Sequence, residues 1–188
     1  MTSTTLDWTR QLSEQLEWHW TRQLRPRFDG LTDAEYFWEP AQPAWNVRPR
    51  TAEGQPGTGP ITVEFAYPEP DPPPVPTIAW RLAHVIVGVL AMRVASHFGG
   101  PAADYGSFAY AGTAAEALAQ LDDAYARWST GVGGLDAAGL ARPCGPAEGP
   151  FAEYPMAALV LHINREVIHH GAEVALLRDL YRARTAAS

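Results

Sequence analysis

The sequence contains a single cysteine and no lysine. One cysteine, Cys144, excludes an internal disulfide framework, and no histidine is close to it in its Pro/Gly-rich stretch. We therefore interpret it as an incidental loop thiol. All of the basic residues are arginines, and the net charge is −7. This balance argues against nucleic acid or an anionic membrane as a partner.

Long apolar runs are also absent. No run of eighteen apolar residues occurs, so we expect no membrane-spanning segment. The first fifteen residues lack a basic start followed by an apolar block, which predicts no signal peptide and a cytoplasmic protein. Charged residues make up 19% and hydrophobic residues 46% of the chain, as is typical of globular proteins. The length suits a single domain, residues 1–188.

Several segments carry apolar residues at the spacing of long helices. The predicted helices cover residues 6–25, 77–98, 113–130 and 154–182. The stretch LTDAEYFWEP predicts a short helical turn, with Thr32 or Asp33 as its cap and Pro40 as its stop. These elements predict an all-α fold, an antiparallel four-helix bundle.

Residues 41–76 form a long irregular region that is rich in proline and glycine. Within it, ITVEFAY predicts a short strand or an extended segment. A loop of this length in a compact domain is often functional. The helices on both sides need each other to bury their apolar faces, so we interpret the region as a crossover and flap between the first two long helices.

Ionisable side chains crowd one stretch of the last predicted helix, LHINREVIHHGAEVALLRDL. At about 100° per residue they share about a third of the helix circumference. They are His162, Glu166, His169, His170 and Glu173. On these residues alone, two interpretations stay open. A solvated face of Glu–His pairs is common, but the remaining sides are largely apolar, as in a buried helix, where such groups need partners or a metal.

Glu166 with His170 or His169 could bind one divalent ion, and a third ligand has to come from another helix. The candidate is His84 in IAWRLAHVIVG, although a hydrogen-bonded core histidine is the alternative. His97 lies about 220° further round the same helix, so we interpret it as a terminal-turn residue that points elsewhere. Three ligands with an open position are typical of a catalytic metal that activates water or a thiol.

The stretches LTDAEYFWEPAQPAWNVRP, TIAWRLAHV with HFG, and NREVIHHGAEVALLRDLY together resemble the DinB-like superfamily over nearly the whole chain. The resemblance implies a four-helix bundle that holds one divalent metal. Many members use three histidines, whereas the mycothiol-dependent maleylpyruvate isomerase group uses a His, Glu, His set. This chain resembles the latter, with His84, Glu166 and His170 as ligands and His169 turned aside toward a packing or supporting contact.

Some neighbours of this implied site have open roles. His162 could be a fourth ligand, an acid/base or a substrate contact, and Glu173 could orient an imidazole or be solvated. These two are the candidate catalytic residues. Trp80 and Arg81 could line the pocket, although we interpret Arg81 as part of a surface ion pair.

The resemblance implies a metal-dependent enzyme that activates a low-molecular-weight thiol such as mycothiol, or water, for transfer to a small electrophilic substrate. Zinc is the expected metal, with nickel, manganese or iron as alternatives. S-transferases, isomerases and hydrolases are all candidates, because a shared fold does not choose among them. The isomerases carry a further domain that is not expected here, so isomerase activity does not follow.

The alternative function is a non-catalytic helical bundle that binds a small molecule or a stress signal. The seven tryptophans could supply an interface, so we expect a homodimer.

Overall fold

The computed structural model describes residues 6–186, and the protein is mostly helical, as predicted. The long helices are α1 (Trp8–His19), α5 (Ala114–Gly133) and α7 (Met156–Ala186). A further rod consists of α3 (Ile78–Ala83), a π-helical segment (His84–Ala91) and α4 (Met92–Phe98). The short elements are α2 (Asp33–Tyr36), α6 (Ala137–Ala141) and the turns Trp20–Leu24, Arg25–Phe28 and Pro146–Phe151.

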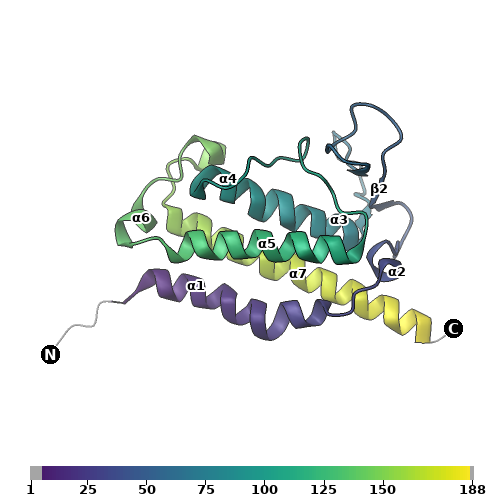
Figure 1. The fold of residues 1–188 in the computed structure, drawn as a ribbon, viewed down its shortest axis with the longest axis horizontal. Helices are drawn as coiled ribbons and strands as arrows, with labels where there is room; N and C mark the ends of the chain where they lie inside the picture. The colour runs from purple at the N-terminus through teal and green to yellow at the C-terminus, as the bar shows by residue number, and fades with distance from the viewer. Residues whose placement is uncertain (1–5, 187–188) are drawn as a thin grey trace.

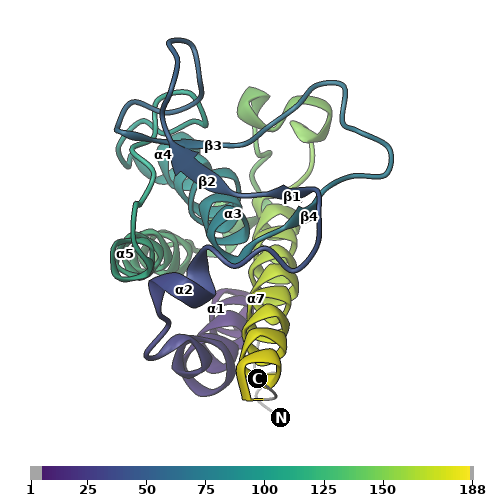
Figure 2. The same cartoon turned by 90° about the vertical axis from the view of Figure 1, so that its right-hand side faces the viewer.

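The long helices lie side by side along the molecule (Figures 1 and 2). α1 and α7 run in one direction, and the α3–α4 rod and α5 run in the other (Figure 1). The rod and α5 share a direction because residues 99–113 carry the chain back along the molecule before α5 begins. Neighbouring helices are therefore not all antiparallel, which corrects the simple alternation expected from the sequence.

Local side-chain chemistry sets the ends of the α3–α4 rod. The Thr77 side chain accepts a hydrogen bond from the Trp80 backbone N–H at 3.2 Å, which caps the start of α3. Gly99 follows α4 with φ +68°, a left-handed conformation that glycine adopts without strain. The predicted range of residues 77–98 is confirmed.

Core packing accounts for the apolar composition of this rod. Of the described helices, Ile78–Phe98 is long and apolar enough to cross a membrane by length and composition alone. However, 61% of its most apolar window is buried inside the structure. The rod packs against α5 and α7, as the core helix of a folded domain does.

Short strands organise the region between residues 41 and 76 (Figure 2). β1 (Ala44–Trp45) pairs in parallel with β4 (Val75–Pro76), and β2 (Val47–Pro49) pairs antiparallel with β3 (Ile61–Val63). The strand expected in ITVEFAY is confirmed as β3. Buried Asn46 attaches this flap to the helices: its Nδ2 donates to the Phe37 carbonyl, and its Oδ1 accepts from the Thr77 hydroxyl, both at 3.0 Å.

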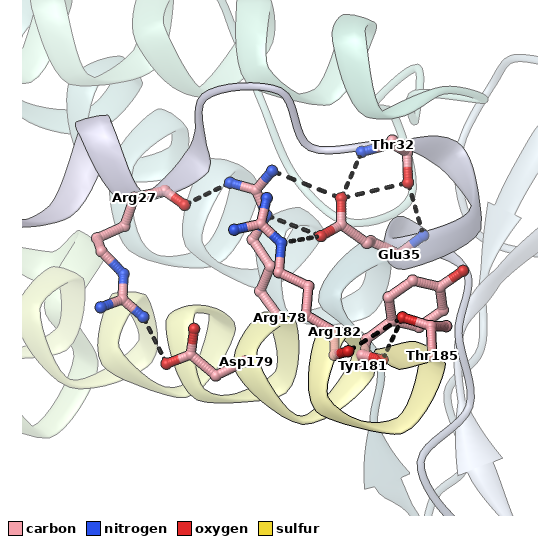
Figure 3. Close-up of polar contacts among 8 residues, drawn as sticks. All are labelled: Arg27, Thr32, Glu35, Arg178, Asp179, Tyr181, Arg182 and Thr185. Carbon is pink, nitrogen blue, oxygen red and sulfur yellow. Dashed lines mark hydrogen bonds and ion pairs between the residues drawn. The ribbon is translucent and has the colours of Figure 1, made fainter. Parts of the chain in front are cut away.

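A buried ionic network fastens α7 to α2 (Figure 3). Glu35, only 3% exposed, accepts hydrogen bonds from Arg178 Nε at 3.0 Å and Arg182 Nε at 2.9 Å. Glu35 also accepts from the backbone N–H of Thr32 at 2.8 Å, completing the cap of α2. This network helps to hold the rotation of α7, and with it the direction in which the polar stripe faces.

Candidate metal centre

Three side chains from two helices converge between the rod and α7. His84 lies at the start of the π-helical segment, and Glu166 and His170 lie one turn apart on α7. One donor atom from each residue lies within 4.8 Å of the donors of the other two, and all three residues are half-buried. His170 Nε2 is 3.2 Å from Glu166 Oε2. Two imidazoles and a carboxylate form a donor set suited to zinc and other divalent transition metals.

Each of the two imidazoles has a polar partner at Nδ1, the ring nitrogen that faces away from the candidate centre. His170 Nδ1 lies 2.8 Å from Glu173 Oε2, and His84 Nδ1 lies 2.8 Å from the Tyr105 hydroxyl. With Nδ1–H as the donor in both contacts, each Nε2 keeps its lone pair for an ion. Such contacts hold the tautomer and orientation of a metal-ligating histidine. Glu173 therefore lies where it can orient an imidazole, one of the roles considered for it.

Arg81, on α3, contacts Glu173, the residue on α7 that is the partner of His170. Its side chain is 14% exposed, and its Nε lies 2.8 Å from Glu173 Oε2. Burial lowers the pKa of Arg81, and the charge of Glu173 opposes that shift. The expected ion pair of Arg81 is present, but its location at the surface was wrong, because the pair is half-buried and its carboxylate contacts His170.

The electrostatic environment keeps His84 unprotonated at neutral pH. Burial, together with the charges of His170 and Arg81, lowers the pKa of His84 to about 4, although the charges of Glu166 and Glu173 oppose the shift. A neutral imidazole is the form that binds a metal ion. His84 is therefore ready to act as a ligand without first losing a proton.

Sequence reasoning missed Tyr105, which lies in the connection between α4 and α5. No periodic pattern marks this loop residue. The only sequence signal is Gly88, one turn after His84, because a Cβ there would lie 2.0 Å from the Tyr105 hydroxyl. Gly88 thus leaves the space through which Tyr105 reaches His84. The hydroxyl of Tyr110 donates to the Tyr105 carbonyl at 2.8 Å and supports the loop.

His162 lies beside the centre and not within it. Its Nδ1 is 3.6 Å from Glu166 Oε1 and 2.6 Å from Arg165 Nη2. Arg165 Nε is also 3.6 Å from Glu166 Oε1. The carboxylate therefore presents one oxygen to His170 and the other to the His162–Arg165 side, where His162 could contact a substrate or exchange a proton.

His169 is 63% exposed, and its Nε2 lies 3.5 Å from Glu173 Oε1. With His170 and Glu173 it forms a second group whose donors lie within 4.8 Å of one another. The two groups share His170. The first group joins two helices and is more enclosed, so it is the stronger candidate for a metal centre.

The remaining candidates lie elsewhere. His97 points away from His84, as predicted, and its side chain is buried against Glu148, with its Nε2 2.9 Å from Glu148 Oε1. Cys144 is a free, buried thiol, and burial raises its pKa. Both features fit the interpretation of Cys144 as an unreactive loop residue.

Comparison with known families adds one finding. A family model described as the DinB superfamily matches residues 15–174. The matched range contains His84, Glu166 and His170. No curated protein and no solved structure matches the chain.

Proposed function

Because this chain belongs to the DinB superfamily, we propose that it is a metal-dependent enzyme built on a four-helix bundle of that type. His84, Glu166 and His170 are the proposed ligands, and zinc is the proposed metal. The observation that carries this proposal is the convergence of these side chains from two helices, with the second nitrogen of each imidazole already engaged.

The proposed reaction is the transfer of a low-molecular-weight thiol such as mycothiol, or of water, to a small electrophile. A divalent ion in such a site lowers the pKa of a bound thiol or water and makes it nucleophilic at neutral pH. Glu173 and Tyr105 hold the two imidazoles in orientation, and Arg81 holds Glu173. His162, beside the outer oxygen of Glu166, is the proposed group for proton transfer.

A soluble thiol is favoured over a protein thiol as the nucleophile. The chain's only cysteine is buried, and burial raises its pKa, so it is poorly suited to attack. A thiol nucleophile therefore has to be supplied as a small co-substrate.

Metal analysis of protein purified without chelators tests the ligand set. We expect close to one divalent ion per wild-type chain and a large loss of metal in His84→Ala and Glu166→Ala. His169→Ala is the matched control, since it removes an imidazole from the exposed side of the same helix turn. Full metal retention in both ligand variants would exclude this centre.

Turnover tests the reaction. Zinc-loaded protein is assayed against a panel of small electrophiles with mycothiol, with another low-molecular-weight thiol and with water alone. We expect turnover that needs both metal and thiol, and that His162→Gln slows without loss of metal. Metal-dependent hydrolysis without thiol would assign water as the nucleophile.

A non-catalytic binding protein is the second candidate function. It is favoured by a groove of about 510 Å³ beside His84, which could hold a small molecule without any chemistry. This function predicts that a ligand stabilises the protein equally with and without chelator, and that no electrophile is turned over.

We also propose that the protein is a cytoplasmic homodimer. Trp8 and Trp18 on α1 are 61% and 60% exposed, and exposed aromatic side chains of this size are typical of interfaces. Light scattering coupled to gel filtration measures the mass, and a monomer at micromolar concentration would contradict the dimer.

A further inference from the structure

The groove beside His84 has an aromatic lining that the proposed metal chemistry does not explain. It lies between the flap and the start of the rod and has a volume of about 510 Å³. Its aromatic lining residues are Trp45, Phe65, Tyr67, Trp80, His84 and Tyr105. We call this the aromatic groove. It adjoins the candidate centre at one ligand, because His84 and its partner Tyr105 both belong to its wall.

The inner rings of the groove are nearly parallel. The Trp45 and Trp80 rings have centroids 5.1 Å apart and planes inclined by 24°. The Trp80 and His84 rings have centroids 5.8 Å apart and planes inclined by only 9°. Because Trp80 already stacks against both Trp45 and His84, Trp45 is the ring of this pair that remains for a ligand to stack on, and we call the Trp45–Trp80 pair the platform. A quaternary ammonium group is bound instead by ring faces arranged around it as a cage.

This platform is held in place by backbone contacts. Trp80 Nε1 donates to the Glu64 carbonyl at 2.8 Å, which sets the orientation of its indole. Trp45 belongs to β1, which is paired with β4. The Trp45–Trp80 platform is therefore formed before any ligand arrives, and stacking on it requires little ordering of the protein.

The charges of the groove disfavour an anionic ligand. Its described lining includes the carboxylates of Glu64 and Glu69 and no arginine. Glu64 is already engaged by Arg48 Nε at 2.9 Å and by the Asn46 backbone N–H at 2.8 Å. The Arg81 guanidinium lies over the Trp80 ring, with its central carbon 5.3 Å from the ring centroid, but its charge is paired with Glu173. A neutral ligand avoids repulsion from these carboxylates.

Phe65 and Tyr67 supply large apolar surface at the rim. They are 67% and 91% exposed, and both lie on the flap segment that follows β3. Exposed aromatic side chains gathered at a groove are typical of ligand-binding sites. They are the side chains available to cover the outer face of a ring that lies on the platform.

We propose that the aromatic groove binds substrates through a neutral, planar aromatic group stacked on the Trp45–Trp80 platform, with the reactive substituent toward His84. The role of this group as a substrate rests on the proposed function, whereas its binding requires no metal. Binding to metal-free protein therefore tests the groove separately from the enzyme.

Titration calorimetry of full-length, chelator-treated protein is the experiment. The probes are 2-naphthol, its saturated analogue decahydro-2-naphthol, the anion 2-naphthoate and the cation 2-naphthyltrimethylammonium. We expect 2-naphthol to bind at least about fivefold more tightly than each of the others, as a stacking contribution predicts. Equal binding of the saturated analogue, tighter binding of either ion, or no binding at millimolar concentration would overturn the proposal.

Variants test whether 2-naphthol binds in the aromatic groove. Trp45→Leu keeps apolar bulk but removes the flat face, and we expect it to weaken 2-naphthol binding about five- to tenfold. Phe151→Leu, at an exposed position at the end of the turn Pro146–Phe151, is the control and should leave binding unchanged. Phe65→Ala, at an exposed rim position, provides a second variant that does not put folding at risk, and it should weaken binding severalfold. Unchanged affinity in both groove variants overturns the proposal.

The two proposals can fail separately. If metal analysis fails and 2-naphthol still binds as expected, the groove remains a binding site in a non-catalytic protein. If the metal is bound and 2-naphthol is not, the centre remains and the aromatic substrate class is excluded.

Discussion

Tyr105 and Gly88 act together on His84. The Tyr105 hydroxyl contacts His84 Nδ1 at 2.8 Å, and Gly88 provides the space that this hydroxyl occupies. A side chain that touches a ligand and not the metal still affects metal affinity, because it holds the tautomer and the ring orientation. The roles of both residues can be tested by measuring metal affinity, which requires no knowledge of the substrate.

Tyr105→Phe removes this contact and keeps the ring. We expect zinc affinity to fall about 10- to 100-fold, because the His84 imidazole loses the partner that orients it. Competition with a chromophoric chelator measures the affinity. Tyr67→Phe is the control, because that side chain is 91% exposed. Equal zinc affinities for Tyr105→Phe and wild type would contradict this role.

Gly88→Ala should weaken zinc binding at least as much. The added Cβ would lie 2.0 Å from the Tyr105 hydroxyl and 2.9 Å from the carbon that bears it, so Tyr105 has to move away from His84. Gly133→Ala is the matched control, since nothing lies within 4 Å of a Cβ at that helical position. The same chelator competition applies, and adding Tyr105→Ala to Gly88→Ala should cause little further loss. Undiminished zinc binding by Gly88→Ala would show that Tyr105 does not support His84.

At the scale of elements, α7 combines the candidate centre in its middle with an ionic anchor near its end. The polar stripe can face the rod only if the helix keeps its rotation about its own axis. Glu35 on α2 holds that rotation through Arg178 and Arg182, and Arg178 is itself only 2% exposed (Figure 3). This contact therefore contributes both to the stability of the fold and to the geometry of the candidate centre.

Glu35→Gln leaves Arg178 buried without its counter-charge. We expect the free energy of unfolding to fall by about 2–4 kcal/mol, because an uncompensated buried charge is costly. Urea denaturation measures the change. Asp179→Asn is the control: it breaks the exposed ion pair with Arg27, which should contribute less than about 1 kcal/mol. A similar loss of unfolding free energy in both variants would mean that the burial of the Glu35 network contributes nothing to stability.

At the scale of the whole molecule, acid stability reports on the same network. Burial by itself would raise the pKa of Glu35, but hydrogen bonds from Arg178 and the Thr32 backbone, with the charge of Arg178, lower it below its ordinary value of 4.5. The folded state therefore binds the proton more weakly than the unfolded state. This contribution is present above about pH 4.5 and is lost as the pH falls through the folded-state pKa.

We therefore expect the difference in unfolding free energy between wild type and Glu35→Gln to be constant near neutral pH and to shrink below about pH 4.5. Urea denaturation of both proteins between pH 7 and pH 3 measures it. A difference that stays constant throughout this range would show that Glu35 does not titrate in the folded state with a lowered pKa.

Local signals predicted much of the fold. Apolar spacing located the long helices, including the rod at residues 77–98, and Thr32 marked the start of α2. The i,i+4 spacing of Glu166 and His170 placed both on one face of α7, because helical geometry depends only on residues a few positions apart.

The sequence by itself thus determined which residues share a helix face, and helix geometry pointed to Glu166 with either His169 or His170. The set of His84, Glu166 and His170 came from the resemblance to the DinB-like superfamily. Only the tertiary structure decided which faces meet. The contact between Tyr105 and His84 spans 21 positions, and that between Arg81 and Glu173 joins two helices. The shared direction of α5 and the rod depends on the path of residues 99–113. The physical reason is that periodicity fixes the angle of a side chain about its own helix axis, whereas loop paths and core packing fix where that axis lies relative to its neighbours.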